Sequence, residues 1–166
     1  TGIVLKNIGA AQVFISDVAE KRLAIAKELG LTPVDVSKED LNKIVKEATG
    51  GEGCDVLFEC SGSAQAAMDM TEITRVSGTI CMVSVHKKPH EVNLQQLNFK
   101  EQWMIGTRVY TKEEFGQAVK YTQTLQPQLE KVVTHIVPLK DADRVFDMIA
   151  DVSQGTVKVV VDCKDV

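Results

Sequence analysis

Short apolar runs alternate with amphipathic segments along almost the whole chain. Runs typical of buried strands cover residues 12–17, 32–36, 54–59, 78–83, 103–107, 132–137 and 157–161. Helical periodicity of apolar positions is found in residues 1–8, 19–29, 41–48, 63–74, 111–125 and 145–149. Strands that take turns with helices are typical of a parallel sheet with helical crossovers. The pattern therefore predicts an α/β fold.

Capping patterns mark the starts of two predicted helices. Ser37, followed three residues later by Asp40, resembles a capping box, and Thr111 with Glu114 forms a second such pattern. The helix after Thr111 presents an apolar face made of Phe115, Ala118, Val119, Thr122 and Leu125. We expect this face to be buried.

Composition is that of one soluble globular domain. The 166 residues are 44% apolar and 25% charged, with 19 basic and 23 acidic residues. The basic residues are scattered rather than gathered in a stripe, which argues against a nucleic-acid partner. No apolar run approaches the roughly 20 residues of a membrane span, and no signal peptide is visible. We expect a cytoplasmic protein without a membrane partner.

No metal site is expected in this chain. The four cysteines contain no C-x-x-C pair, and two of them lie in apolar runs, so reduced core thiols are predicted; they are Cys54, Cys60, Cys81 and Cys163. His86 and His90 have the i, i+4 spacing of a helical metal pair, but Pro89 lies between them.

An acid ends the apolar run at residues 12–17. Asp17 follows this run and leads directly into a predicted helix, as at the second strand of a dinucleotide-binding fold. An acid there accepts hydrogen bonds from the adenosine ribose hydroxyls and repels a 2′-phosphate, so NAD is favoured over NADP. The first strand and glycine-rich turn of such a fold would precede the helix-like start at residues 1–8.

Several spaced motifs together resemble the zinc-dependent medium-chain dehydrogenases, in particular the butanediol, sorbitol and threonine dehydrogenases. The motifs are Ser16-Asp17, Arg22-Leu23, the block from Glu47 to Val56, and Glu59-Cys60-Ser61-Gly62. The resemblance implies a Rossmann-like doubly wound parallel sheet over residues 1–166, lacking the first strand and glycine-rich turn. It also implies that zinc belongs to a separate catalytic domain of the parent enzyme and is not bound by this chain.

The resemblance implies cofactor-binding residues at the ends of successive strands. Asp17 would bind the adenosine ribose, with Arg22 near the same ribose and adenine; ordinary capping and surface charge is the competing interpretation. The Cys60, Ser61 and Gly62 turn would line the adenine-side crevice, or be a tight turn alone. The remaining positions bracket the nicotinamide or reach the pyrophosphate. They are Val83, Ser84, Val85, Gly106, Thr107, Val109 and Lys158, of which Lys158 equally suits a solvated edge strand.

The resemblance further implies an NAD-dependent alcohol or polyol dehydrogenase that assembles as a homo-oligomer. By itself, this chain is expected to be inactive. No catalytic residue is assigned to the chain itself. Two alternatives stay open. One is a non-catalytic nucleotide-binding or assembly module, and the other is a zinc-free quinone reductase-like protein. Such reductases usually bind NADPH, which fits Asp17 poorly.

Overall fold

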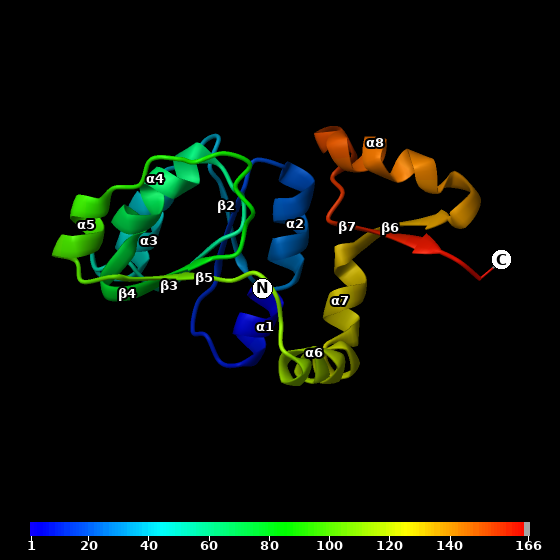
Figure 1. Ribbon diagram of the computed structural model, residues 1–166, viewed down its shortest axis with the longest axis horizontal. Coiled ribbons are helices and arrows are strands. Elements are labelled where there is room, and N and C mark those ends of the chain that lie inside the picture. The colour runs from blue at the N-terminus through cyan, green and yellow to red at the C-terminus, as the bar shows by residue number, and fades with distance from the viewer. Residues whose placement is uncertain (165–166) are drawn as a thin grey trace. The chain divides into compact units, whose positions relative to one another are not determined.

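The computed structural model describes residues 1–164 and has the expected α/β architecture (Figure 1). The chain forms two compact units. The first joins Thr1–Glu39 to the chain from Thr111 onward, and the second is Asp40–Tyr110. Every pair of neighbouring strands in the described residues is parallel, as the alternating pattern predicts.

The first unit begins with two helices and two strands. They are α1 (Gly2–Asn7), β1 (Phe14–Asp17), α2 (Glu20–Glu28) and β2 (Thr32–Asp35). β1 and β2 pair so that Asp17 stands opposite Asp35 at the carboxyl end of the pair. Leu23 and Ala26 of α2 are buried, together with Val34 of β2, because the helical and extended apolar positions face one another.

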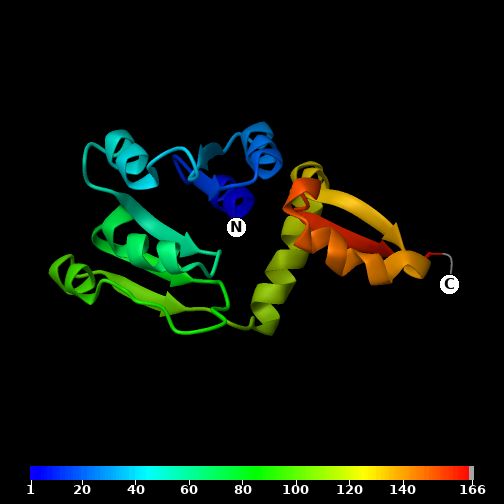
Figure 2. The ribbon, with the colours of Figure 1, turned by 90° about the horizontal axis from the view of Figure 1, so that it is seen from above.

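The later part of the first unit is built from short elements. They are α6 (Lys112–Thr124), α7 (Gln126–Val132), β6 (Val133–Pro138), η1 (Leu139–Arg144), α8 (Val145–Ala150), η2 (Val152–Gln154) and β7 (Lys158–Asp162). β6 and β7 run side by side (Figure 2). The predicted capping box at Thr111 and Glu114 is confirmed. The buried face predicted for α6 is wrong except at its end, because Leu125 is buried whereas Phe115 and Val119 are exposed.

The second unit consists of three strands and three helices. They are α3 (Leu41–Ala48), β3 (Cys54–Glu59), α4 (Ala64–Ile73), β4 (Thr74–Met82), α5 (Leu94–Phe99) and β5 (Trp103–Gly106). The strands lie in the order β3–β4–β5, and α4 packs against β3 and β4 (Figure 1). Ala67 and Met70 of α4 and Ile80 of β4 form the core of this unit.

Two sequence predictions about local structure are wrong. The N-cap of α3 is Asp40, whose side chain accepts a hydrogen bond from the Lys43 N–H, whereas Ser37 binds Asp35 in the preceding turn. Cys54 and Cys81 are half-buried and Cys60 and Cys163 are exposed, so none of the four is a core thiol; no disulfide joins them. Helices α5 and α7 were not expected, because both are short and lack a clear apolar period.

The parallel strands are divided among three sheets in the described residues. β1 pairs with β2, β3 and β5 flank β4, and β6 pairs with β7. In the usual strand order of a dinucleotide-binding fold, a central strand separates the strand ending in Asp17 from the strand that begins at Cys54. In the described residues, β1 and β3 each have one strand neighbour.

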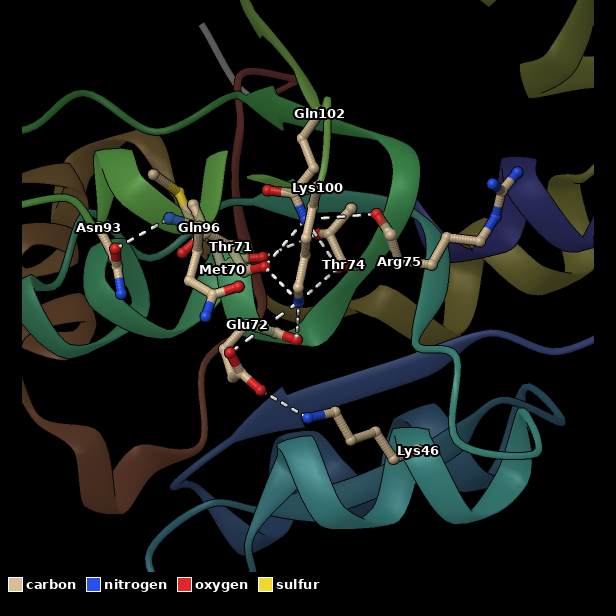
Figure 3. A network of polar contacts seen from close by, with 10 residues as sticks. All are labelled: Lys46, Met70, Thr71, Glu72, Thr74, Arg75, Asn93, Gln96, Lys100 and Gln102. Atoms are coloured by element: carbon tan, nitrogen blue, oxygen red, sulfur yellow. Dashed lines mark hydrogen bonds and ion pairs between the residues drawn. The ribbon is translucent and has the colours of Figure 1, made fainter. Parts of the chain in front are cut away.

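A lysine and a glutamine complete the end of α4, which runs into β4 without a loop (Figure 3). The Lys100 ammonium donates to the carbonyls of Thr71, Glu72 and Thr74 at 2.9, 2.8 and 3.1 Å. The Gln102 amide also donates to Thr71 and Thr74. These donors satisfy carbonyls that a helix end leaves without partners, and the cation faces the negative end of the helix dipole.

We predict that Lys100→Met destabilises the complete protein by about 1–3 kcal/mol, because it removes charged hydrogen bonds to carbonyls that stay buried. Urea unfolding measures this change in the free energy of unfolding. Lys43→Met is the matched control, since Lys43 pairs with Glu47 on the exposed side of α3. Its effect should stay within about 0.5 kcal/mol. Equal effects of the two substitutions would contradict the role given to Lys100.

The carboxyl of Asp35, at the end of β2, provides a pH-dependent prediction. Hydrogen bonds from Lys38 and Ser37 lower its pKa from 3.8 to about 2. Because the folded pKa is depressed, the stability that this carboxylate contributes is fully present above about pH 3.8 and is lost as the pH falls through about 2. An NMR titration should place its midpoint at about 2, and Lys38→Met should move it upward. An unchanged midpoint in that variant would refute the assignment.

Candidate functional site

Asp17 occupies the carboxyl end of β1 and uses one carboxylate oxygen to start α2. Its Oδ1 accepts hydrogen bonds from the N–H groups of Val18 and Ala19 at 2.8 and 2.9 Å. Its Oδ2 lies 3.5 Å from Nη1 of Arg22, which is a weak contact. The side chain is 25% exposed. One oxygen is therefore held by the backbone, and the other can accept hydrogen bonds from a ligand.

Arg22 lies beside Asp17, as the sequence suggested, but it has a second partner that the sequence did not reveal. Its Nε donates to the carbonyl of Thr156 at 3.0 Å, and Lys21 donates to Ser153 at 2.9 Å. α2 is thereby tied to the segment before β7. Lys158 is exposed at the start of β7, and among the described residues no ion pair joins it to Asp17.

A buried carboxylate organises the carboxyl end of β3, and sequence reasoning did not assign it to the site. Glu59 is 2% exposed. Its Oε1 accepts from the Ser61 N–H at 2.8 Å, the Ser61 hydroxyl at 2.6 Å and the Gly62 N–H at 2.9 Å. The Ser61 and Gly62 turn is thus wrapped around one oxygen. The available signal was an acid directly before a small-residue turn.

The same residue joins this turn to the end of β4. The Ser84 hydroxyl donates to Glu59 Oε2, and Nε2 of His86 lies 3.2 Å from that oxygen. The main-chain carbonyl of Glu59 accepts from the N–H groups of Val83 and Ser84 at 2.9 and 3.0 Å. Predicted site residues on two neighbouring strands are therefore held by one residue.

Electrostatics favour the charged form of Glu59. Burial raises the pKa of its carboxyl, but hydrogen bonds from Ser61, Ser84 and the Gly62 N–H outweigh this effect and leave the pKa below its ordinary value. The Glu59 carboxylate therefore stays ionised near neutral pH and acts as a hydrogen-bond acceptor.

A cavity of about 490 Å³ opens beside this turn, at the start of α4. It is lined by Ser61, Gly62, Ser63, Ala64, Val85, Lys87, Lys88 and His90, three of which are predicted cofactor-binding residues. A second hollow, of about 660 Å³, lies by α5 and the start of β5, and none of the predicted residues lines it. Ligands of parallel sheets bind at the carboxyl ends of strands, so the smaller cavity is the candidate site.

Gly106 is the last residue of β5 and Thr107 follows it, but neither lines this cavity. The N–H and the hydroxyl of Thr107 donate to the Met82 carbonyl at 3.0 and 3.1 Å, which fixes the end of β5 to the end of β4. Val109 lies further along and is 82% exposed. Cys60, in the turn after β3, is also exposed.

Zinc does not fit the described residues. In residues 1–164, no three or more His, Cys, Asp or Glu side chains come together in a group that could hold a metal ion. His86 and His90 contact each other edge to face, with ring centroids 5.2 Å apart.

Within the described residues, no helix has the length and apolar character needed to cross a membrane.

Comparison with known proteins identifies relatives along nearly the whole chain. 2-Dehydro-3-deoxy-L-galactonate 5-dehydrogenase of Pseudoalteromonas atlantica is 34% identical over 160 residues, covering 96% of this chain and 46% of that protein. L-Threonine 3-dehydrogenase of an Enterobacter species is 32% identical over 157 residues, covering 93% and 46%. The chain spans about half the length of the curated relatives it matches.

A solved structure confirms the fold class. 2R,3R-Butanediol dehydrogenase from Bacillus subtilis superimposes with a TM-score of 0.85 at 27% identity, covering 96% of this chain and 46% of that one. The α/β fold is therefore the Rossmann-like cofactor-binding fold of medium-chain dehydrogenases. A family model described as zinc-binding dehydrogenase matches residues 1–124. The chain belongs to the zinc-binding dehydrogenase family.

Proposed function

We propose that this chain is the NAD-binding part of an NAD-dependent zinc-type alcohol or polyol dehydrogenase. The observation that carries the proposal is the position of Asp17, whose Oδ2 is available at the carboxyl end of β1 while Oδ1 caps the following turn. The names of the relatives, which are dehydrogenases of threonine, butanediol and a sugar acid, support an oxidoreductase.

Asp17 would select the cofactor by two effects of one charge. Its free oxygen accepts hydrogen bonds from the hydroxyls of the adenosine ribose, and these bonds are strong because the acceptor is ionised. The same charge repels the 2′-phosphate of NADP. Arg22 contacts Asp17 and donates to the carbonyl of Thr156. It would keep the carboxylate oriented and lie near the same ribose and adenine.

The residues after β3, β4 and β5 would bind the rest of the cofactor. Ser61, Gly62 and Val85 line the cavity beside α4. We assign Cys60 to the same turn and Val83, Ser84, Gly106, Thr107 and Val109 to the nicotinamide end. Lys158 is proposed to offset pyrophosphate charge.

Hydride transfer is the chemistry that the nicotinamide itself supplies, so this chain would bind and orient it. The described residues hold no ligand set for zinc, and no step is assigned to a metal in them. The substrate is proposed to be a small alcohol or polyol.

We also propose self-association, because Trp103 and Ile105 on the edge strand β5 are exposed and such an edge invites pairing.

Asp17→Asn tests the role of the charge, because an amide oxygen can still cap the N–H groups of Val18 and Ala19. We predict about tenfold weaker NAD binding and a reduced preference for NAD over NADP, since an ionised acceptor is replaced by a neutral one. Isothermal titration of the complete protein with both dinucleotides measures this.

Asp35→Asn is the matched control for Asp17→Asn, because Asp35 stands opposite Asp17 in the register of the two strands. Its NAD affinity should change less than threefold. Equal affinity of the unaltered protein for NAD and NADP, or tighter NADP binding, would overturn the proposal.

We predict that purified residues 1–166 alone do not oxidise alcohols or polyols with NAD. The family places the zinc that polarises the alcohol in another domain, and without it the hydroxyl proton is too weakly acidic for hydride to leave. Following NADH absorbance over a panel of alcohols tests this. Turnover by the isolated chain, with no added protein, would contradict it.

A further inference from the structure

One side chain supports three of the strand-end residues that are proposed to meet the cofactor in the second unit. Glu59 binds the turn that follows its own strand, through Ser61 and Gly62, and the end of the neighbouring strand, through Ser84. It does not line the cavity that this turn borders. Glu59 therefore acts on the site through the groups it holds rather than by contact with a ligand.

We propose that Glu59 is a positioning residue whose side chain holds the Ser61 and Gly62 turn and Ser84 in the conformation that binds the dinucleotide. The inference rests on the proposed function for its ligand. Glu59 is not among the predicted site residues, and its contacts fix main-chain groups from two strands at one place.

The turn gains from such support because its glycine is conformationally free by itself. Gly62 has φ +68°, in the left-handed region, and its N–H is held by Glu59 Oε1. Ser61 donates both its N–H and its hydroxyl to the same oxygen. Without this acceptor the turn would have to be ordered by the ligand, and the entropy of ordering would be subtracted from the binding free energy.

The two carboxylate oxygens have separate tasks. Oε1 serves the turn after β3, whereas Oε2 serves Ser84 and lies 3.2 Å from Nε2 of His86. A carboxylate can only accept, so the His86 nitrogen carries a proton when it donates there. His86 therefore adds a donor to a carboxylate that other groups already satisfy, and Glu59 is 2% exposed.

Reach rather than charge is the property that the geometry requires of Glu59. Glutamine keeps the length of the side chain and an oxygen in the place of Oε1, while its amide can donate to the Ser84 oxygen. Aspartate keeps the charge but is one methylene shorter, so its oxygens cannot serve the turn and Ser84 at once. The two substitutions therefore separate positioning from electrostatics.

The experiment measures NAD affinity and amide hydrogen exchange at Ser61 and Gly62 in the complete protein. We expect Glu59→Asp to bind NAD about tenfold more weakly, with faster exchange at both amides, because ordering a turn residue costs about this factor in affinity. Glu59→Gln should restore binding to within about threefold and slow the exchange again. The KM for NAD should follow the affinity in both variants.

Asp55→Asn is the control, because Asp55 lies on the same strand, is exposed and pairs with Arg75 away from the cavity. It should change neither readout. NAD affinity of Glu59→Asp equal to that of the unaltered protein would overturn the inference, and so would a weaker affinity with unchanged amide exchange. Greater loss in Glu59→Gln than in Glu59→Asp would assign the effect to charge and overturn it as well.

The proposed function and this inference fail in different ways. If the unaltered protein does not bind NAD, the proposed function fails, and the amide exchange of the ligand-free variants still decides whether Glu59 holds the turn. If the unaltered protein binds NAD and Asp17→Asn weakens it, the proposed function stands. The inference is then decided by Glu59→Asp and Glu59→Gln alone.

Discussion

The buried Glu59 carboxylate is the interaction on which the site in the second unit depends. A buried polar side chain must be fully hydrogen-bonded, and the donors to Glu59 come from the turn after β3 and from the end of β4. Those donors cannot move without leaving a buried oxygen of Glu59 without a partner. The requirement of one side chain thus fixes the conformation of main-chain groups at two strand ends.

Asp17 and Glu59 show how the same chemical group serves two purposes. Both end a parallel strand, and both accept N–H groups of the chain that follows. Glu59 is 2% exposed and both its oxygens are occupied, so it can only support structure. Asp17 is 25% exposed, and its second oxygen has one weak contact. Exposure and unused acceptor capacity therefore distinguish the acid that is proposed to bind a ligand from the acid that is proposed to position the turn.

Two side-chain donors, one of them a cation, complete the end of α4 in the same unit. Lys100 and Gln102 donate to the last carbonyls of α4, which lets the helix pass directly into β4 (Figure 3). Lys100 thus places a charge at the close of α4, whereas the neutral Ser63 hydroxyl caps its start.

The sequence by itself determined the order of the strands and of most helices, the parallel class of the strands, the Thr111 capping box and the acid at the end of β1, because periodicity and caps are local properties. It also carried the motifs of the zinc-binding dehydrogenase family. The sequence pattern misplaced the cap of α3, which is Asp40 rather than Ser37. Tertiary structure decided that the apolar face of α6 is exposed and that Glu59, Ser84 and His86 meet. Those contacts join residues up to 27 positions apart, from Glu59 to His86, so only the pairing of β3 with β4 brings them together.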